Sequence, residues 1–211
     1  MQATAHSELS VRELRRDDLA DVADVHIAAF RDSSMTSLGH EALRRYYRWL
    51  LEGPHRSTAL GAFDRDRLVG YSFGGVFNGA LTGFLRANRV FLAWRVATHP
   101  WLIANPLFRD NIALALQLLR PRRVASPSNQ AEPRPYGILS IAVDPARHGK
   151  GVGQALMRRN EQIARTTGFD RMILTVAPTN TQAIRFYERD GWQKLMVDGT
   201  WSKGAMTKRL A

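Results

Sequence analysis

The segment from Ile138 to Trp192 most constrains what this chain can fold into, because it reads as strand, glycine-rich turn, helix, strand and helix in succession. The first strand runs from Gly137 to Val143 and is closed by an Asp-Pro pair. A turn follows with the sequence His148-Gly149-Lys150-Gly151-Val152-Gly153, and a helical run begins near Val152. Because the first amides of a helix are unpaired and its dipole is positive there, the turn predicts a site for a diphosphate.

Other uses of a glycine-rich turn can be compared on the same residues. A Walker loop needs a Ser or Thr after its lysine, whereas Gly151 follows Lys150. A dinucleotide fingerprint needs a different final glycine spacing and an acid that closes the next strand, and the strand from Met172 to Ala177 ends without an acid. A turn that serves only tight packing between strand and helix stays an alternative to a phosphate site.

The turn resembles one signature of the GNAT acetyltransferase superfamily, whose members use acetyl-CoA. The family pattern is Arg/Gln-x-x-Gly-x-Gly/Ala, and its first, fourth and sixth positions are filled here by His148, Gly151 and Gly153. His148 departs from the usual Arg or Gln, and a neutral imidazole offers less charge. Arg147 or Lys150 is therefore expected to share the contact with phosphate.

A second stretch resembles the family's other signature, Asn-x-x-Ala-x-x-x-Tyr-x-x-x-Gly-Phe. It begins at Asn180, keeps Ala183, Tyr187 and Gly191, and has Trp192 in place of Phe. Two signatures in the family's order are more specific than either one alone. The resemblance implies an N-acetyltransferase that moves an acetyl group from acetyl-CoA to a primary amine, by direct attack in a ternary complex.

The resemblance also implies roles for individual residues. Tyr187 is expected to be the general acid, because a phenol with a pKa of about 10 keeps its proton at neutral pH and delivers it to a leaving thiolate whose pKa is about 8.5. A core position beside Phe186 is the alternative for Tyr187, and a helix N-cap is the alternative for Asn180. The expected acetyl-CoA contacts are Ile141, Ala142, Val143, His148, Gly149, Lys150, Gly151, Val152, Gly153, Asn180 and Tyr187.

The fold class implied is α+β (α/β), a GNAT fold with a central mixed, mostly antiparallel, twisted sheet flanked by helices and carrying a helical insertion. Hydrophobic patterns predict a strand at 9–14, helices from Asp17 or Asp18 to Phe30 and at 39–51, and a hairpin of strands at 58–63 and 68–77. A closing hairpin is predicted at 193–208 around an Asp198-Gly199 turn. The chain, 1–211, is expected to form one domain with an acceptor-side half at about 8–78, an insertion at about 79–135, an acetyl-CoA-binding half at about 136–193 and a C-terminal hairpin at about 193–209.

The insertion between Gly79 and Pro135 is rich in Leu, Phe, Trp and Arg. Helical runs are expected at 81–95 and 111–119, followed by a basic, proline-containing loop. Two helices that cover the acceptor side of the core are one interpretation. Peripheral contact with a membrane or a lipid-linked substrate is the other, since basic and aromatic residues mix there.

The acceptor side is less closely specified by the sequence. Candidates on the first two helices and the loop between them, the region that faces the acceptor in this family, are His26, Phe30, Ser33 and Tyr46. No Glu stands in the strand from Gly137 to Val143, where many family enzymes carry a base, so the general base is open, with a water relay through Ser140 as one alternative. An amino sugar is slightly favoured among small-molecule and peptide amines, because Tyr and Trp side chains offer stacking surfaces.

Composition narrows the chemistry further. A chain of 211 residues with 45% hydrophobic content can bury a sizeable core, and the absence of cysteine excludes disulfides and a thiol nucleophile. The six histidines show no paired metal spacing, so no metal is expected. The net charge of +11 favours an anionic contact, and the alternative function is a basic protein that binds nucleic acid or an anionic membrane without turnover, although no nucleic-acid motif is present. Without a signal-peptide pattern or a long apolar run the expected location is cytoplasmic, and a homodimer is an open alternative.

Overall fold

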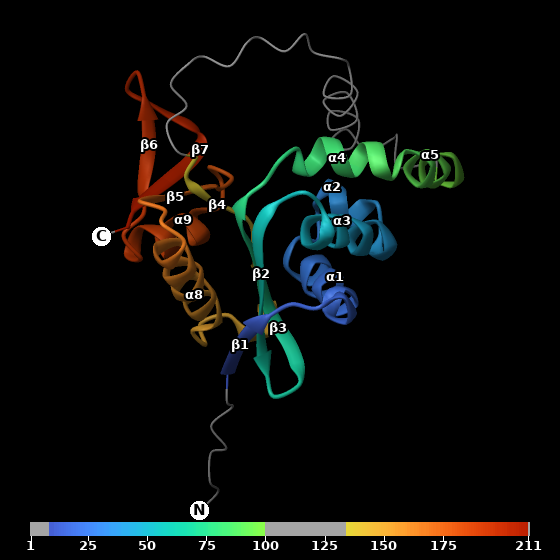
Figure 1. Cartoon of the computed structure of the whole chain (residues 1–211), viewed down its shortest axis with the longest axis horizontal. Coiled ribbons are helices and arrows are strands. Elements are labelled where there is room, and N and C mark those ends of the chain that lie inside the picture. The colour runs from blue at the N-terminus through green and yellow to red at the C-terminus, as the bar shows by residue number, and fades with distance from the viewer. Residues whose placement is uncertain (1–8, 100–133, 211) are drawn as a thin grey trace, which may run out of the picture.

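The structure of the chain is a computed structural model that describes residues 9–99 and 134–210. Its strands form a seven-stranded sheet in the order β1-β2-β3-β4-β5-β7-β6 (Figure 1). Within the described sheet, β4 and β5 run parallel and the other neighbours run antiparallel. The expected α+β fold with a mixed, mostly antiparallel sheet is confirmed. The strands are β1 (Leu9–Glu13), β2 (Arg56–Asp64), β3 (Arg67–Val76), β4 (Tyr136–Val143), β5 (Arg171–Thr175), β6 (Gln193–Val197) and β7 (Thr200–Arg209).

Helices flank the sheet, with α1 and α3 on one face and α8 on the other (Figure 1). The short helices α4 and α5 extend from the α3 side (Figure 1). The α-helices are α1 (Leu19–Ala29), α2 (Ser34–Ser37), α3 (His40–Glu52), α4 (Ala80–Ala87), α5 (Arg89–Thr98), α8 (Val152–Thr166) and α9 (Thr181–Arg189). Single 3₁₀ turns precede α1 and α8, at η1 (Arg16–Asp18) and η2 (Pro145–Arg147).

The two faces of the sheet bury separate apolar clusters. On one face Val22 of α1 and Leu43 of α3 are completely buried, and on the other Val152 and Leu156 of α8 pack against β2 and β3. Apolar residues three or four apart along each helix form the stripe that makes this burial favourable. Gly70 in β3 lets the start of α8 come close, because a Cβ there would lie only 2.8 Å from Cγ1 of Val152. This packing positions the turn before α8 beside the end of β4.

The elements expected on either side of the insertion are present, with ends shifted by one or two residues. The prediction of a single helix at 81–95 is wrong, because α4 and α5 are separated at Asn88. The Asn88 side-chain amide donates to the Phe84 carbonyl at 3.1 Å, and its backbone leaves the helical conformation. The second run expected at 111–119 and the basic loop after it lie outside the described residues.

The two parallel strands at the middle of the sheet separate part-way along their length. β4 pairs with β5 only from Tyr136 to Ile138, opposite Met172 to Leu174, and further along it pairs with β3 alone among the described strands. A bulge marks the change, because Ile138 and Ser140 oppose consecutive residues of β3 and Leu139 is the extra residue. The free edge of β4 therefore presents backbone groups without a neighbouring strand.

A buried polar chain fastens α8 to the sheet. Asn160 of α8 is completely buried, and its Oδ1 accepts a hydrogen bond from the Tyr136 hydroxyl at 3.0 Å. Its Nδ2 donates to Oγ of Ser72 and to the Leu156 carbonyl, both at 2.8 Å. Polar groups buried in this way stabilise a fold only while every partner is present.

Replacing Asn160 with Ala should lower the free energy of unfolding by about 3 kcal/mol, because it leaves the Tyr136 and Ser72 hydroxyls buried without this partner. Urea unfolding followed by circular dichroism measures the change. Arg159→Ala, one residue earlier on the exposed side of α8, is the matched control and should change stability by less than about 0.5 kcal/mol. Equal effects of the two substitutions would show that the polar chain does not stabilise the fold.

Candidate active site

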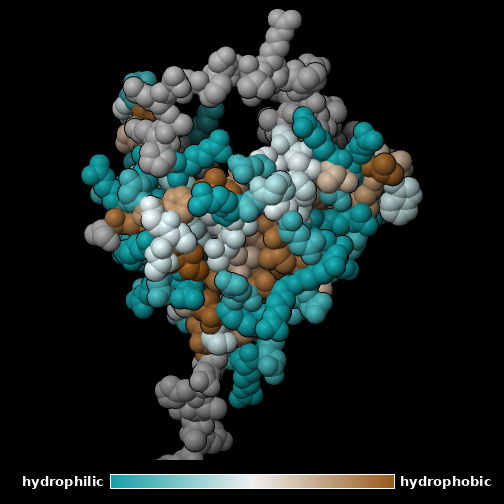
Figure 2. All heavy atoms as spheres, viewed as in Figure 1, coloured by the Kyte–Doolittle hydropathy of each residue, from teal (hydrophilic) through white to brown (hydrophobic). Residues whose placement is uncertain are grey.

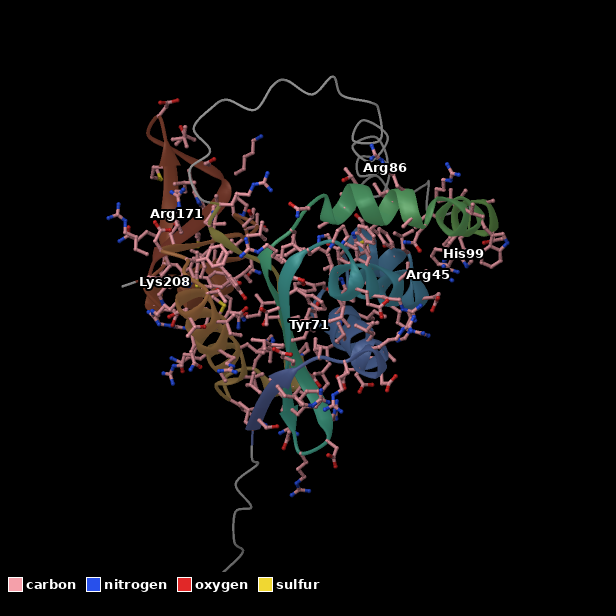
Figure 3. All side chains as sticks on the ribbon, viewed as in Figure 1. Arg45, Tyr71, Arg86, His99, Arg171 and Lys208 are labelled. Atoms are coloured by element: carbon pink, nitrogen blue, oxygen red, sulfur yellow. The ribbon has the colours of Figure 1, made fainter. Side chains whose placement is uncertain are left out.

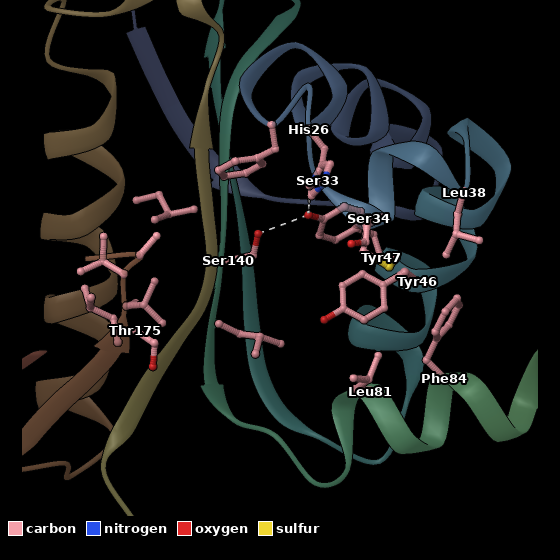
Figure 4. Close-up of a pocket in the computed structure, with 18 of the residues that line it drawn as sticks. His26, Ser33, Ser34, Leu38, Tyr46, Tyr47, Leu81, Phe84, Ser140 and Thr175 are labelled. Carbon is pink, nitrogen blue, oxygen red and sulfur yellow. Dashed lines mark hydrogen bonds between the residues drawn. The ribbon is translucent and has the colours of Figure 1, made fainter. Parts of the chain in front are cut away.

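A cleft of about 670 Å³ lies between the separated strands and the helices of the N-terminal half (Figure 4). One wall comes from β4, β5 and α9, and the other comes from α1 to α5. The volume is in the range of small-molecule binding sites. Predicted site residues that line the cleft are His26, Phe30, Ser33, Tyr46, Ile141, Asn180 and Tyr187. The structure thus brings the predicted acceptor-side residues and part of the predicted cofactor set into one cavity.

The glycine-rich turn lies beyond the lining of this cleft, at the start of α8. Gly149 and Gly151 have φ angles of 75° and 78°, a left-handed conformation that strains any side chain. The first hydrogen bond of α8 runs from the Ala155 N–H to the Gly151 carbonyl at 2.9 Å. The amides from Gly151 to Gln154 precede that bond and have no partner inside the helix. Such a row of amides is the geometry that binds an anion.

Side chains around the turn differ in what they contact. Nε2 of His148 lies 3.2 Å from the Val143 carbonyl, so the ring turns back toward β4. Arg147, expected to share the phosphate contact, forms an ion pair with Asp64 at the end of β2. Lys150 is exposed on the turn itself. Lys150 is therefore the better candidate to supply charge to a bound phosphate.

The remaining predicted cofactor residues take structural positions. Ala142 is buried in the apolar cluster beneath α1 and α3. Val152, the first residue of α8, is buried against β2 and β3. Gly153 faces α9, where an added Cβ would meet the Phe186 ring at 3.5 Å and Cγ2 of Val143 at 3.7 Å. Both distances are ordinary van der Waals contacts, so Gly153 lies beside the end of β4 and α9 with room for a methyl group. These residues have their backbones, rather than functional side chains, to offer a ligand.

The helix α9 presents two predicted residues to the cleft. Asn180 is its N-cap, since Oδ1 accepts a hydrogen bond from the Ala183 N–H at 3.0 Å, and it also lines the cleft. Tyr187, two helical turns further on, packs its ring between Phe186 and Trp192, and burial raises its pKa to about 12. Among the described residues no group forms a hydrogen bond with the Tyr187 hydroxyl.

A hydrogen-bonded network joins α1, α3, β3 and β4 at one side of the cleft (Figure 4). Nδ1 of His26 lies 2.7 Å from the Tyr47 hydroxyl and 3.0 Å from the Tyr71 hydroxyl. The two phenol oxygens are 2.6 Å apart, and the Tyr47 oxygen lies 3.2 Å from Oγ of Ser140. Nε2 of His26 faces Oγ of Ser33 at 3.3 Å. Figure 3 shows Tyr71 in the middle of the molecule, between the two halves.

Burial keeps this network uncharged. It lowers the pKa of His26 to about 4 and raises the pKa values of Tyr47 and Tyr71 well above 10. With Nδ1 assigned as the acceptor of a phenol hydrogen bond, the imidazole proton lies on Nε2 and is donated to Ser33. Both ring nitrogens are then engaged, and a pKa of about 4 is too low for a base at neutral pH. The low pKa and the two engaged nitrogens make the His26 imidazole a weak proton acceptor, and its role on the acceptor side stays a prediction.

Tyr46 and the insertion complete the wall of the cleft on the side of the N-terminal helices. The Tyr46 hydroxyl points into the cleft, its ring meets the edge of Phe84, and burial raises its pKa to about 12. Tyr71 was not among the residues predicted from the sequence, although alternation with Phe73 along β3 could have placed both on one face. The sequence also did not show which insertion residues reach the cleft, and those described are Leu81, Phe84, Leu85, Leu92 and Val96. The described part of the insertion thus lines the cleft, and its expected role in covering the acceptor stays a prediction.

The profile of the acetyltransferase (GNAT) family matches residues 19–192 of this sequence. The chain belongs to the GNAT acetyltransferase family. The match takes in the cleft, the glycine-rich turn and α9, and leaves out β1, β6 and β7.

Solved structures share this GNAT fold. The PaiA N-acetyltransferase from Thermoplasma acidophilum, solved in complex with coenzyme A, superimposes with a TM-score of 0.59 and 15% identity over 96% of this chain and 99% of that chain. A GNAT family acetyltransferase from Brucella melitensis, in complex with acetyl-CoA, gives a TM-score of 0.52 and 18% identity over 96% and 97% of the two chains. At these identities the likeness concerns the fold.

Sequence relatives match this chain over shorter stretches and are larger proteins. The mycothiol acetyltransferase of Thermobispora bispora is 38% identical over 61 residues, which are 29% of this chain and 21% of that protein. That of Geodermatophilus obscurus is 28% identical over 81 residues, or 38% of this chain and 26% of that protein. The chain spans about a quarter of the length of the curated relatives that it matches.

Metal sites and membrane-spanning helices were also sought in the described part of this GNAT enzyme. Among the described residues, no set of three or more His, Asp or Glu side chains is arranged to hold a metal ion. None of the described helices has the length and apolarity of a membrane span. Contact with a membrane surface through the insertion and assembly into a homodimer stay predictions.

The His26 ring should titrate with a midpoint near pH 4, because the charged imidazolium is disfavoured by burial in the folded protein. In the unfolded chain the His26 ring titrates near pH 6.5, so unfolding at a pH between about 4 and 6.5 takes up a proton on this ring. The free energy of unfolding therefore falls as the pH falls from about 6.5 to 4, and His26→Gln should remove that part of the decline. Proton NMR of the ring resonances measures the midpoint, with the other histidines as references. A midpoint near 6.5 would show that the ring is hydrated.

Proposed function

We propose that this GNAT enzyme transfers the acetyl group of acetyl-CoA to a primary amine of a small molecule or peptide, by direct attack in a ternary complex. The observation that carries the proposal is the cleft itself. It joins the free edge of β4, from Leu139 to Ile141, to Tyr187 on α9 and to a separate wall built by the N-terminal helices. Two substrates can therefore enter from different sides and meet at the edge of β4.

The cofactor would lie along the free edge of β4. The amides of the turn after His148 would bind the diphosphate, with Lys150 adding charge. Backbone groups of Ile141 and Val143 would bind the pantetheine arm, and an amide near Ile141 would polarise the thioester carbonyl, as an oxyanion site does. The CoA and acetyl-CoA bound in structures that share the fold support this placement. Binding along a strand edge suits the extended pantetheine arm, since its two amide groups can pair with backbone donors and acceptors.

Tyr187 would act on the leaving sulfur. Its raised pKa of about 12 keeps the phenol protonated at every physiological pH, so it is always a hydrogen-bond donor. Full proton transfer from such a phenol to a thiolate of pKa about 8.5 is uphill by roughly 3.5 pK units. We therefore propose that the hydroxyl stabilises the developing thiolate by a hydrogen bond. The proton that finally rests on the CoA thiol is then the one that the amine loses, and Tyr187 is unchanged after each turnover.

The amine would lose its proton without a dedicated protein base. Neither Asp nor Glu is found among the described residues that line the cleft, and both nitrogens of His26 are engaged. An ammonium group that leaves water for an apolar cavity has its pKa lowered, because the charged form loses its hydration. The neutral amine is the nucleophile that results. Water reaching the network at Ser140 would carry away this first proton, and the second proton, which the nitrogen loses after attack, is the one that ends on the CoA thiol.

Gly151→Glu should abolish the binding of CoA and acetyl-CoA, because a carboxylate at the start of α8 repels the diphosphate. Isothermal titration calorimetry measures the affinity, which we expect to be micromolar for the unchanged protein.

Gly168→Glu is the matched control. Gly168 follows the other end of α8, has a φ angle of 83° close to the 78° of Gly151, and has no atom within 4 Å of an added Cβ, as is true of Gly151. The control therefore introduces the same charge and the same backbone strain, and it should bind CoA with less than a twofold change. No binding by the unchanged protein would contradict the acetyltransferase proposal.

Tyr187→Phe should lower kcat at least tenfold while the affinity for CoA changes less than twofold. The hydroxyl has no hydrogen-bond partner among the described residues, so its removal should cost catalysis and little stability. Release of the CoA thiol, followed with a chromogenic disulfide, measures turnover, and calorimetry measures affinity. An unchanged kcat would remove Tyr187 from the mechanism and leave it as a packing residue beside Trp192.

A further inference from the structure

The acceptor wall of the cleft is built mainly from apolar side chains of the two insertion helices. The described residues that form this apolar wall are Leu38, Leu81, Phe84, Leu85, Leu92 and Val96. Leu81 and Phe84 face the cleft opposite β4 and lie beside Tyr46 (Figure 4). Hydrophobic residues also gather toward the middle of the molecular face in Figure 2, with hydrophilic residues around them. The apolar wall is on the side away from α9, and so on the side away from the residues that would hold the cofactor.

Charge is absent from the described lining of the cleft. No Asp, Glu, Lys or Arg is found among the described residues that line it, and the polar groups there are hydroxyls, His26 and Asn180. Four of these nine polar side chains are already engaged, because His26, Ser33, Tyr47 and Ser140 hydrogen-bond with one another or with Tyr71. A second ammonium group, or a ring carrying many hydroxyls, would lose its hydration in such a cleft and find few partners there.

We propose that the acceptor is a primary amine carried on an uncharged, apolar body, aliphatic or aromatic, which packs against the apolar wall of α4 and α5. This inference rests on the proposed function and deepens it by naming the substrate class. It runs against the amino sugar that the sequence slightly favoured, and against polyamines. It also gives the insertion a role, since α4 and α5 supply most of the apolar wall.

A series of straight-chain primary amines tests the chemical class. Ethylamine to octylamine have nearly equal basicity, so differences in kcat/KM report on the contact of the chain with the protein. With the full-length enzyme and saturating acetyl-CoA, kcat/KM should rise about fourfold for each added methylene until the wall is covered. Glucosamine and spermidine should react at least tenfold more slowly than hexylamine. A flat series, or a preference for glucosamine or spermidine, would overturn the proposal.

A pair of substitutions tests the apolar wall itself. Leu81→Asp places a carboxylate on it, at the second position of α4, where an acid is compatible with the helix dipole. Val90→Asp is the matched control, because Val90 is the second residue of α5, is 76% exposed and is not part of the cleft lining.

Hexylamine and 1,6-diaminohexane are the matched substrates for these variants, since they differ only in a second ammonium group at the far end. The unchanged enzyme should prefer hexylamine at least tenfold per amino group. Leu81→Asp should lower the ratio of kcat/KM for hexylamine to kcat/KM for 1,6-diaminohexane at least tenfold. Val90→Asp should change this ratio less than twofold. The same shift in both variants would mean that surface charge, and not the apolar wall, selects the acceptor.

Two further readouts separate this inference from the proposed function. Calorimetric titration of the same amines into the CoA-bound protein should show affinity rising with chain length. No thiol release from any amine, with that trend intact, would contradict the acetyltransferase proposal and leave the apolar wall as a binding site. Faster turnover with hexanoyl-CoA than with acetyl-CoA, and no dependence on amine length, would assign the wall to the acyl chain and overturn the acceptor class.

Discussion

The separation of β4 from β5 after Ile138 is the constraint on which the site depends. As long as two strands pair, their backbone groups satisfy each other, and beyond the bulge at Leu139 the edge of β4 has only β3 as a described neighbour. An exposed strand edge in the middle of a sheet is costly unless something extended occupies it. The cleft, the approach of α9 and the position of the glycine-rich turn all follow from this opening. The pantetheine arm is the extended partner that the proposed function supplies.

The two walls of the cleft are kept in place by different interactions. On the side where the cofactor is expected, Asn160 fastens α8 to β3 and β4 through a buried polar chain. On the acceptor side the hydroxyl groups of Tyr47 and Tyr71 meet His26 between helix and sheet. Burial disfavours the charged form of each of these groups. It therefore lowers the pKa of the imidazole, raises the pKa values of the phenols and keeps the network neutral.

Sequence predicted the parts of this protein that local patterns encode. The run from Ile138 to Trp192 is contiguous, so its strand, turn and helices could be read directly, and the N-cap role of Asn180 followed from its type and position. Tyr71 could not be placed, because its partners His26 and Ser140 are far away in sequence and meet it only through the sheet register. The break at Asn88 was missed because a helical pattern continues across it, while one side-chain hydrogen bond ends α4. The ion pair that engages Arg147 is likewise a long-range contact.

The strong positive charge of the chain and the lack of charged side chains in the described lining of the cleft would both favour acceptors with a single amine. A net charge of +11 attracts the phosphates of CoA over a range set by the Debye length, and it repels amines that carry several positive charges. Once inside, an amine meets hydroxyl groups and apolar side chains, so a single ammonium that can lose its proton is tolerated better than a polycation. A base with a carboxylate would have reversed that preference by stabilising the ammonium form. The lack of such a carboxylate among the described lining residues is therefore consistent with the apolar wall, since both favour an amine that reacts in its neutral form.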